Sequence, residues 1–132
     1  MIEGKLDVEL VPQGTLVERI RCGGAGLGGV ITPTGIGTDV EIGKEKININ
    51  GISYLIELPI RGDVSILHAH RGDGNGNLIY RRAARNFNPV AALASDFVVA
   101  QVDHLETESF LDPNSVMTPG AVVDALLSSR SA

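Results

Sequence analysis

The sequence predicts one α/β domain, residues 1–132, in which an open sheet carries β-hairpin additions. Segments with apolar side chains at every second position, the period of a strand, alternate with short segments that begin with helix-start patterns. Clusters of glycine, proline and asparagine separate these segments, and two of them have the composition of hairpin turns. Mixed helices and strands interrupted by hairpins are typical of an α/β sheet with antiparallel additions.

The first element expected is a short strand over residues 6–11, which runs into the turn sequence Pro12-Gln13-Gly14. A helix is predicted to open at Thr15, because Thr15 followed three residues later by Glu18 is the pattern of a capping box. Gly23 stands where a left-handed helix cap belongs. This order places Gln13 at the carboxyl end of a strand.

Two hairpins are expected in the middle of the chain. Apolar residues recur at every second position from Lys46 to Leu58 on either side of Asn50-Gly51, which predicts a hairpin with a type I′ turn. A second pair of strands, residues 64–70 and 78–81, flanks a polar loop at residues 72–77 and predicts a hairpin with a longer loop.

Two residue pairs that end in proline predict helices in the last part of the chain. Asn88-Pro89 is the pattern of a helix cap followed by proline in the first turn, so residues 89–95 are expected to be helical and to precede a strand over residues 97–102. Thr118-Pro119 repeats the pattern. The helix expected after it carries the apolar residues Val122, Val123, Leu126 and Leu127.

Composition and charge exclude several classes of function. Eleven Lys and Arg against sixteen Asp and Glu give a net charge of −5 without a run of like charges, which argues against a nucleic-acid or acidic-membrane partner. Cys22 is the single cysteine of the sequence, so an intrachain disulfide is impossible. No stretch reaches the roughly 18 to 20 apolar residues of a membrane span, and a signal-peptide pattern is missing at the start, so we expect a cytoplasmic protein.

Glycine-rich residues 24–29 fit the dinucleotide-binding pattern GxGxxG, which requires a strand before the glycines and a helix after them. The expected order here is the reverse, with a capped helix before the glycines and an extended segment after them. This argues against nicotinamide or flavin binding and leaves open a backbone-lined loop near a ligand.

Two histidines have the spacing of a possible metal site. His68 and His70 lie two apart on an expected strand and therefore point to the same face. No third ligand is evident, since His104 is the only other histidine, so packing or solvent exposure is the favoured interpretation and no metal is expected. Cys22 beside a helix end is interpreted as structural. The glutamates are interpreted as surface residues with no acid–base pair among them: Glu41, Glu45, Glu57, Glu106 and Glu108.

Three motifs carry a resemblance to a known family. VPQGTLVERIRCGGAGLGGVITPTGIGTDVEIGK (residues 11–44), HRGDGNGNLIYRRAARNFNPVAALASD (residues 70–96) and MTPGAVVD (residues 117–124) resemble, in order, the A (α) subunit of the family I 3-oxoacid and acetate CoA-transferases. The resemblance implies an open-sheet, Rossmann-like CoA-transferase fold. Such α subunits begin with a further segment that contains a Gly-Gly-Phe motif, so the chain resembles the carboxyl-terminal three fifths of an α subunit, with the amino-terminal part missing.

The resemblance also implies a reaction. In this family a glutamate of a separate B (β) subunit attacks the acyl-CoA thioester, the resulting anhydride is opened by the CoA thiolate, and an acceptor acid reverses the steps. It follows that CoA and short-chain acyl-CoA are substrates and not permanently bound cofactors, and that the CoA-transferase β subunit is a partner in a hetero-oligomer. The chain is then expected to be inactive without the β subunit and the missing segment.

Six positions match the functional motifs of the family. Gln13 matches the glutamine whose amide donates into the oxyanion hole, with a turn residue after Pro12 as the alternative. The GGAG turn near the cleft and the ARNFN motif contribute the expected substrate-binding residues Gly23, Gly24, Ala25, Gly26 and Asn86, with helix capping as the alternative. Residues 26–38 resemble the acetate, butyrate and acetoacetate enzymes. A noncatalytic remnant or binding module of the same fold, and an unrelated nucleotide-binding domain, are the alternative functions.

Overall fold

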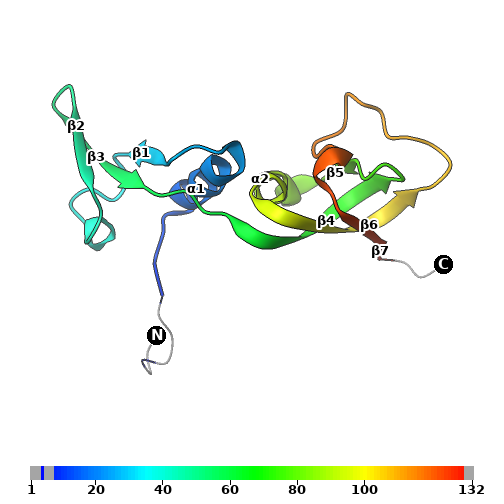
Figure 1. Ribbon diagram of the computed structural model, residues 1–132, viewed down its shortest axis with the longest axis horizontal. Coiled ribbons are helices and arrows are strands. Elements are labelled where there is room, and N and C mark those ends of the chain that lie inside the picture. The colour runs from blue at the N-terminus through cyan, green and yellow to red at the C-terminus, as the bar shows by residue number, and fades with distance from the viewer. Residues whose placement is uncertain (1–3, 5–7, 130–132) are drawn as a thin grey trace.

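The structure is a computed structural model in which residue 4 and residues 8–129 are described. Its chain forms two sheets with two helices between them (Figure 1). A three-stranded sheet occupies one end of the molecule and a four-stranded sheet the other. The helices α1 (Gln13–Ala25) and α2 (Asn88–Leu93) pack against each other in the middle.

The three-stranded sheet is antiparallel, with β3 (Ile52–Glu57) between β1 (Val30–Thr32) and β2 (Lys46–Ile49). Asn50 and Gly51, which join β2 to β3, have positive φ angles of 52° and 82°. Positive φ at both central residues defines a type I′ turn, whose twist matches that of the flanking strands. The first predicted hairpin is confirmed.

The four-stranded sheet is mostly parallel and has the order β5-β4-β6-β7. The long strands β4 (Gly62–Asp73) and β6 (Ser95–Glu106) pair in parallel, and β7 (Ala125–Ser128) extends the sheet in the same direction. β5 (Leu78–Ile79) pairs antiparallel with β4, which confirms the second hairpin. The connection from β4 to β6 passes through α2, as parallel strands require.

The helix predicted after Thr118-Pro119 is wrong. A single 3-10 turn, Gly120–Val122, is followed by the strand β7. Leu126 packs against the buried core while Leu127 is 55% exposed, which is the alternation of a strand. Pairing with the free edge of β6 satisfies the backbone of this segment, so tertiary contacts override its local pattern.

The core lies between α2 and one face of the four-stranded sheet. The fully buried Tyr80 belongs to it, and its hydroxyl is satisfied by a hydrogen bond with Thr118 Oγ1 at 2.9 Å. Burial raises the pKa of Tyr80. The other buried members are apolar: Leu67, Ala69, Leu78, Ala92, Val98, Ala100 and Val102.

The opposite face of the same sheet is open among the described residues. Side chains alternate along a strand, so the neighbours of the buried Leu67 and Val98 point to this face. Ile66 is 84% exposed, and Val64, Phe97 and Leu127 are also exposed. An exposed apolar face of this kind marks an interaction surface or a ligand-binding groove.

The start of α1 differs from the prediction. The helix begins at Gln13, Pro12 is its N-cap without a side-chain hydrogen bond, and Thr15 is buried within the first turn. The proposed capping box of Thr15 and Glu18 is therefore wrong. Of the strand expected at residues 6–11, residues 6 and 7 lie outside the described residues, and residues 8–11 form no strand.

The other helix ends also depart from their expected caps. α1 ends at Ala25 and not at Gly23, in a Schellman motif in which Gly26 N, at φ 69°, donates to Gly23 O and Leu27 N donates to Cys22 O. α2 has Phe87 as its N-cap, so Asn88 does not cap it. The Asn88 side chain instead accepts from His68 N and donates to Ala84 O, which closes the edge of β4 beyond β5.

Asp73, at the end of β4, is a buried carboxylate that organises the loops at this end of the sheet. Its Oδ1 accepts from the N–H groups of Asn75 and Asn77, and its Oδ2 accepts from Asn77 Nδ2 and Leu111 N, at 3.0 to 3.1 Å. Burial alone raises the pKa of Asp73, but these hydrogen bonds outweigh it and hold the pKa below its usual range.

We predict that Asp73→Asn lowers the free energy of unfolding by about 1 to 3 kcal/mol at pH 7, because an amide cannot accept all four bonds. The folded pKa lies below the unfolded value of about 3.9, so the contribution is complete above that value and is lost as the pH falls through the folded pKa. Urea unfolding at pH 7 and pH 3 should therefore show a difference that shrinks in acid.

The exposed Asp63 of the same strand provides the control, and Asp63→Asn is expected to change stability by less than about 0.5 kcal/mol. Equal effects of the two substitutions at pH 7 would contradict the assigned role of Asp73.

Candidate active site

The amino-terminal end of α1 carries Gln13 as its first residue. The Gln13 side chain is exposed, and its amide makes no hydrogen bond with the described part of the chain. The first turn of α1 contains no acidic residue, and no side chain of residues 8–129 caps it, so the positive end of the helix dipole is not neutralised by these residues. This end of α1 can therefore stabilise a negatively charged oxygen.

A hollow of about 540 Å³ lies beside this end of the helix. One wall is formed by the first turns of α1 and the other by β1 and the residues after it. Its lining is apolar apart from Glu18 and the threonine hydroxyls: Pro12, Gly14, Thr15, Val17, Glu18, Val30, Ile31, Thr32 and Thr34. A short acyl group fits such a lining better than a highly charged ligand does.

The glycines at the other end of α1 allow close packing. A Cβ atom on Gly23 would overlap the carbonyl of Ile60, and one on Gly24 would lie 2.9 Å from the carbonyl carbon of Leu93 in α2. Gly26 provides the left-handed cap. Of the GGAG motif, only Ala25 and Gly26 are exposed.

The structure does not bring the predicted site residues together within this chain. Gln13 and Gly24 lie at opposite ends of one helix, about 16 Å apart at a rise of about 1.5 Å per residue. Asn86 follows the 3-10 turn Arg82–Arg85 ahead of α2, where its N–H bonds to Ala83 O and its side chain is exposed. The role of these residues in binding stays a prediction.

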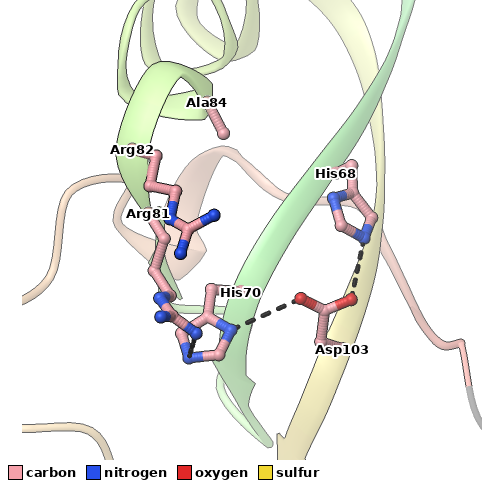
Figure 2. A pocket seen from close by; sticks show the side chains of 6 residues that line it. All are labelled: His68, His70, Arg81, Arg82, Ala84 and Asp103. Atoms are coloured by element: carbon pink, nitrogen blue, oxygen red, sulfur yellow. Dashed lines mark hydrogen bonds and ion pairs between the residues drawn. The ribbon is translucent and has the colours of Figure 1, made fainter.

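The expectation that His68 and His70 share a face is confirmed, and Asp103 of β6 lies between them (Figure 2). Asp103 Oδ1 is 3.0 Å from His68 Nε2, and Oδ2 is 3.3 Å from His70 Nδ1. The hydrogen bond with His70, with a further contribution from His68, lowers the pKa of Asp103. No group of three ligating side chains in residues 8–129 is arranged to hold a metal ion.

Glu57 corrects the interpretation of all five glutamates as surface residues. It is 2% exposed and shares the inner face of β3 with the buried Leu55. Lys44 Nζ lies 2.7 Å from its Oε1, and Arg19 Nη1 lies 3.8 Å from its Oε2. The pattern of β3 could have predicted this burial, since Leu55 and Glu57 are two residues apart.

The order of elements around residues 24–29 is the one expected from the sequence. The glycines follow α1 and precede β1, so the strand–turn–helix arrangement of a dinucleotide site does not form here. Cys22 is buried in α1, in line with a structural interpretation. The described helices include none that is long and apolar enough to cross a membrane.

The sheets, the helix start and the glycine turn are those of an open-sheet α/β protein. The sequence matches the model of the coenzyme A transferase family over residues 1–129, and the chain belongs to this family. The resemblance seen in the three motifs is confirmed.

Two of the relatives are named as α subunits of CoA-transferases. The chain is 52% identical to the acetate CoA-transferase subunit alpha of Escherichia coli K12, with 98% of this chain and 59% of that protein covered. It is 46% identical to the acetoacetyl-CoA:acetate/butyrate CoA transferase alpha subunit of Clostridium acetobutylicum, with 96% and 58% covered. The chain thus spans a little over half the length of these relatives.

Solved structures share the fold. An acyl-CoA transferase of Escherichia coli O157:H7 in a thioester complex with CoA matches with a TM-score of 0.82 and 25% identity, over 98% of this chain and 31% of that one. The glutaconate coenzyme A-transferase of Acidaminococcus fermentans matches with a TM-score of 0.84 over 96% of this chain and 47% of that one. At 17% identity, the second match concerns the fold alone.

We predict that Gly24→Ala destabilises the protein by about 1 to 3 kcal/mol, because its methyl group must push α1 away from the Leu93 backbone. Gly14→Ala is the matched control in the same helix. A Cβ at Gly14 meets open space, and alanine favours the helix, so this change should raise stability by up to about 1 kcal/mol. Thermal unfolding measures both. An unchanged melting temperature for Gly24→Ala would show that close packing at Gly24 does not contribute to stability.

Proposed function

We propose that this chain performs the α-subunit part of a CoA-transferase reaction, moving coenzyme A from a short-chain acyl-CoA to a carboxylic or 3-oxoacid acceptor. One observation carries the proposal: the Gln13 side chain, in the run that matches the family motif, makes no hydrogen bond within residues 8–129 and lies at a helix start that no side chain of these residues caps. The names of the relatives, both α subunits, support the assignment to the α side.

The proposed reaction needs a carboxylate that the β subunit provides. The glutamate oxygen attacks the thioester carbonyl, the negative charge moves to the carbonyl oxygen, and collapse of this intermediate expels the CoA thiolate and leaves an acyl-glutamyl anhydride. The thiolate then attacks the glutamyl carbonyl and releases the first carboxylic acid. The acceptor carboxylate reverses the sequence. Coenzyme A is therefore a substrate at every step.

Gln13 of this chain acts on the oxyanion. Its Nε2 amide donates a hydrogen bond to the carbonyl oxygen as charge develops there, and the free N–H groups of the first turn of α1 add to the field. The apolar hollow beside the helix receives the acyl group. The first turn contributes no carboxylate that would oppose the charge.

The remaining predicted contacts belong to the same proposal. Ala25, Gly26 and Asn86 are exposed and are proposed to contact the substrate, whereas Gly23 and Gly24 are packed against Ile60 and Leu93 and are proposed to contribute backbone atoms only. The open apolar face around Ile66 supports association with further polypeptide, such as the β subunit. Cytoplasm is the proposed compartment.

We predict that the chain alone does not exchange CoA between acetyl-CoA and acetoacetate, and that exchange appears when both the β subunit of a relative and the amino-terminal segment of that relative's α subunit are supplied. The reason is that the nucleophilic carboxylate comes from the β subunit. A β subunit whose nucleophilic glutamate is replaced by glutamine is the control and should give no exchange. Robust exchange by the chain alone, or none in the mixture, would refute the proposal.

Within the active assembly, Gln13→Ala is expected to lower turnover by about a hundredfold or more with little change in assembly or KM, because the donor acts mainly in the transition state. Gln13→Glu keeps the size of the side chain without the amide donor and should lose a similar factor. Arg21→Gln, an exposed change in the same helix, is the control. An unchanged rate in Gln13→Ala would leave Gln13 with a structural role only, as the first residue of α1.

A further inference from the structure

A second hollow, of about 220 Å³, lies near the carboxyl ends of β4 and β6, on elements other than those of the Gln13 site. Figure 2 shows its walls: His68 and His70 project from β4, Asp103 from β6, and Arg81 and Arg82 from the segment after β5. Ala84 completes the lining. Carboxyl ends of parallel strands are where open α/β sheets place ligand sites.

The two arginines have no carboxylate partner among residues 8–129. The arginines and lysines that do have one are Arg19, Arg21, Lys44, Lys46, Arg61 and Arg71. Within these residues the Arg81 side chain contacts His70, with Nη1 3.5 Å from Nε2, the outer limit of a hydrogen bond, so its guanidinium is available to a better acceptor. The Arg82 side chain makes no hydrogen bond or ion pair within the same residues.

The Asp103 carboxylate in this hollow is paired with the two histidines. Each oxygen of Asp103 faces one ring, Oδ1 facing His68 and Oδ2 facing His70. This orients His70 so that Nδ1 faces Asp103 while Nε2 faces Arg81. The negative charge is thus held on the β6 side, and the two guanidinium groups lie on the other side (Figure 2).

The backbone of Arg82 has a strained conformation, in which its side chain lies over the hollow. Its φ of 53° is in the left-handed region, which is unfavourable for a residue with a long side chain. In this conformation the Arg82 guanidinium lies over the same hollow as that of Arg81 (Figure 2). Such strain is most common at functional sites.

We propose that this hollow binds a phosphate-type oxyanion through the guanidinium groups of Arg81 and Arg82. Arginine forks match tetrahedral phosphate as well as carboxylate. A carboxylate has two oxygens, which one guanidinium satisfies, whereas a phosphate group has three or four and a larger charge, and so uses both arginines. The volume of about 220 Å³ accommodates a single phosphate group. Its source is either free phosphate or the 3′-phosphate of CoA.

The proposal is independent of the Gln13 site and is tested by binding. Titration calorimetry of the full chain with inorganic phosphate should show saturable binding, which Arg81→Gln and Arg82→Gln weaken at least tenfold. Arg21→Gln changes an exposed arginine elsewhere and should leave binding unchanged. Acetate should bind much more weakly than phosphate. The ring resonances of His68 and His70 should shift with phosphate in the wild type and not in Arg82→Gln.

The variant Asp103→Asn provides an independent test in case an arginine variant does not fold. Asp103 is the one carboxylate among the six lining residues, so its neutralisation should tighten phosphate binding severalfold, which a misfolded protein cannot do. Competition with CoA and dephospho-CoA identifies the source of the phosphate group. Displacement of bound phosphate by CoA but not by dephospho-CoA points to the 3′-phosphate of CoA, and displacement by neither compound points to free phosphate. No phosphate binding, equal affinity for acetate, or unchanged binding in both arginine variants would overturn the proposal.

Discussion

The attachment of the segment between β3 and β4 to α1 determines where both sheets lie. Ile60 N donates to Arg19 O at 3.0 Å, and Arg61 Nη1 donates to Gly23 O at 2.9 Å. The Ile60 carbonyl comes so close to Gly23 that no side chain fits between them. Because the three-stranded sheet enters this segment and the four-stranded sheet leaves it, α1 is the common support of the two halves.

Two buried carboxylates fix other parts of the fold, and they are stabilised in different ways. Glu57 is held by the cations Lys44 and Arg19, which joins β3 to the helix and to the loop before β2. Asp73 has no cation among its partners and is held by N–H groups and an amide. Loss of one partner of such a buried charge costs more than an intact pair contributes. Glu57 and Asp73 therefore each fix the arrangement of the segments that contact them.

A structural element can be predicted from the sequence where the residues of that element determine its conformation by themselves. Asn50-Gly51 determines its hairpin because only such residues accept positive φ at both positions. The strand at 125–128 is not predictable in this way, because its pairing with β6 is a long-range contact. Gln13 is found only through the family motif, since its residue type also suits a turn. Asp103 and Arg82 escape prediction, because they lie far in sequence from the histidines that they adjoin.

The two ends of α1 belong to one rigid helix, which explains how packing glycines and Gln13, the proposed oxyanion donor, share a motif. A helix transmits displacement along its axis with little bending, so the depth to which Gly23 and Gly24 seat against Ile60 and Leu93 sets the position of Gln13. A displacement of about 1 Å at a reacting group can cost about a hundredfold in rate. The glycines thus influence the proposed oxyanion site without touching substrate, because they determine where the helix begins in space.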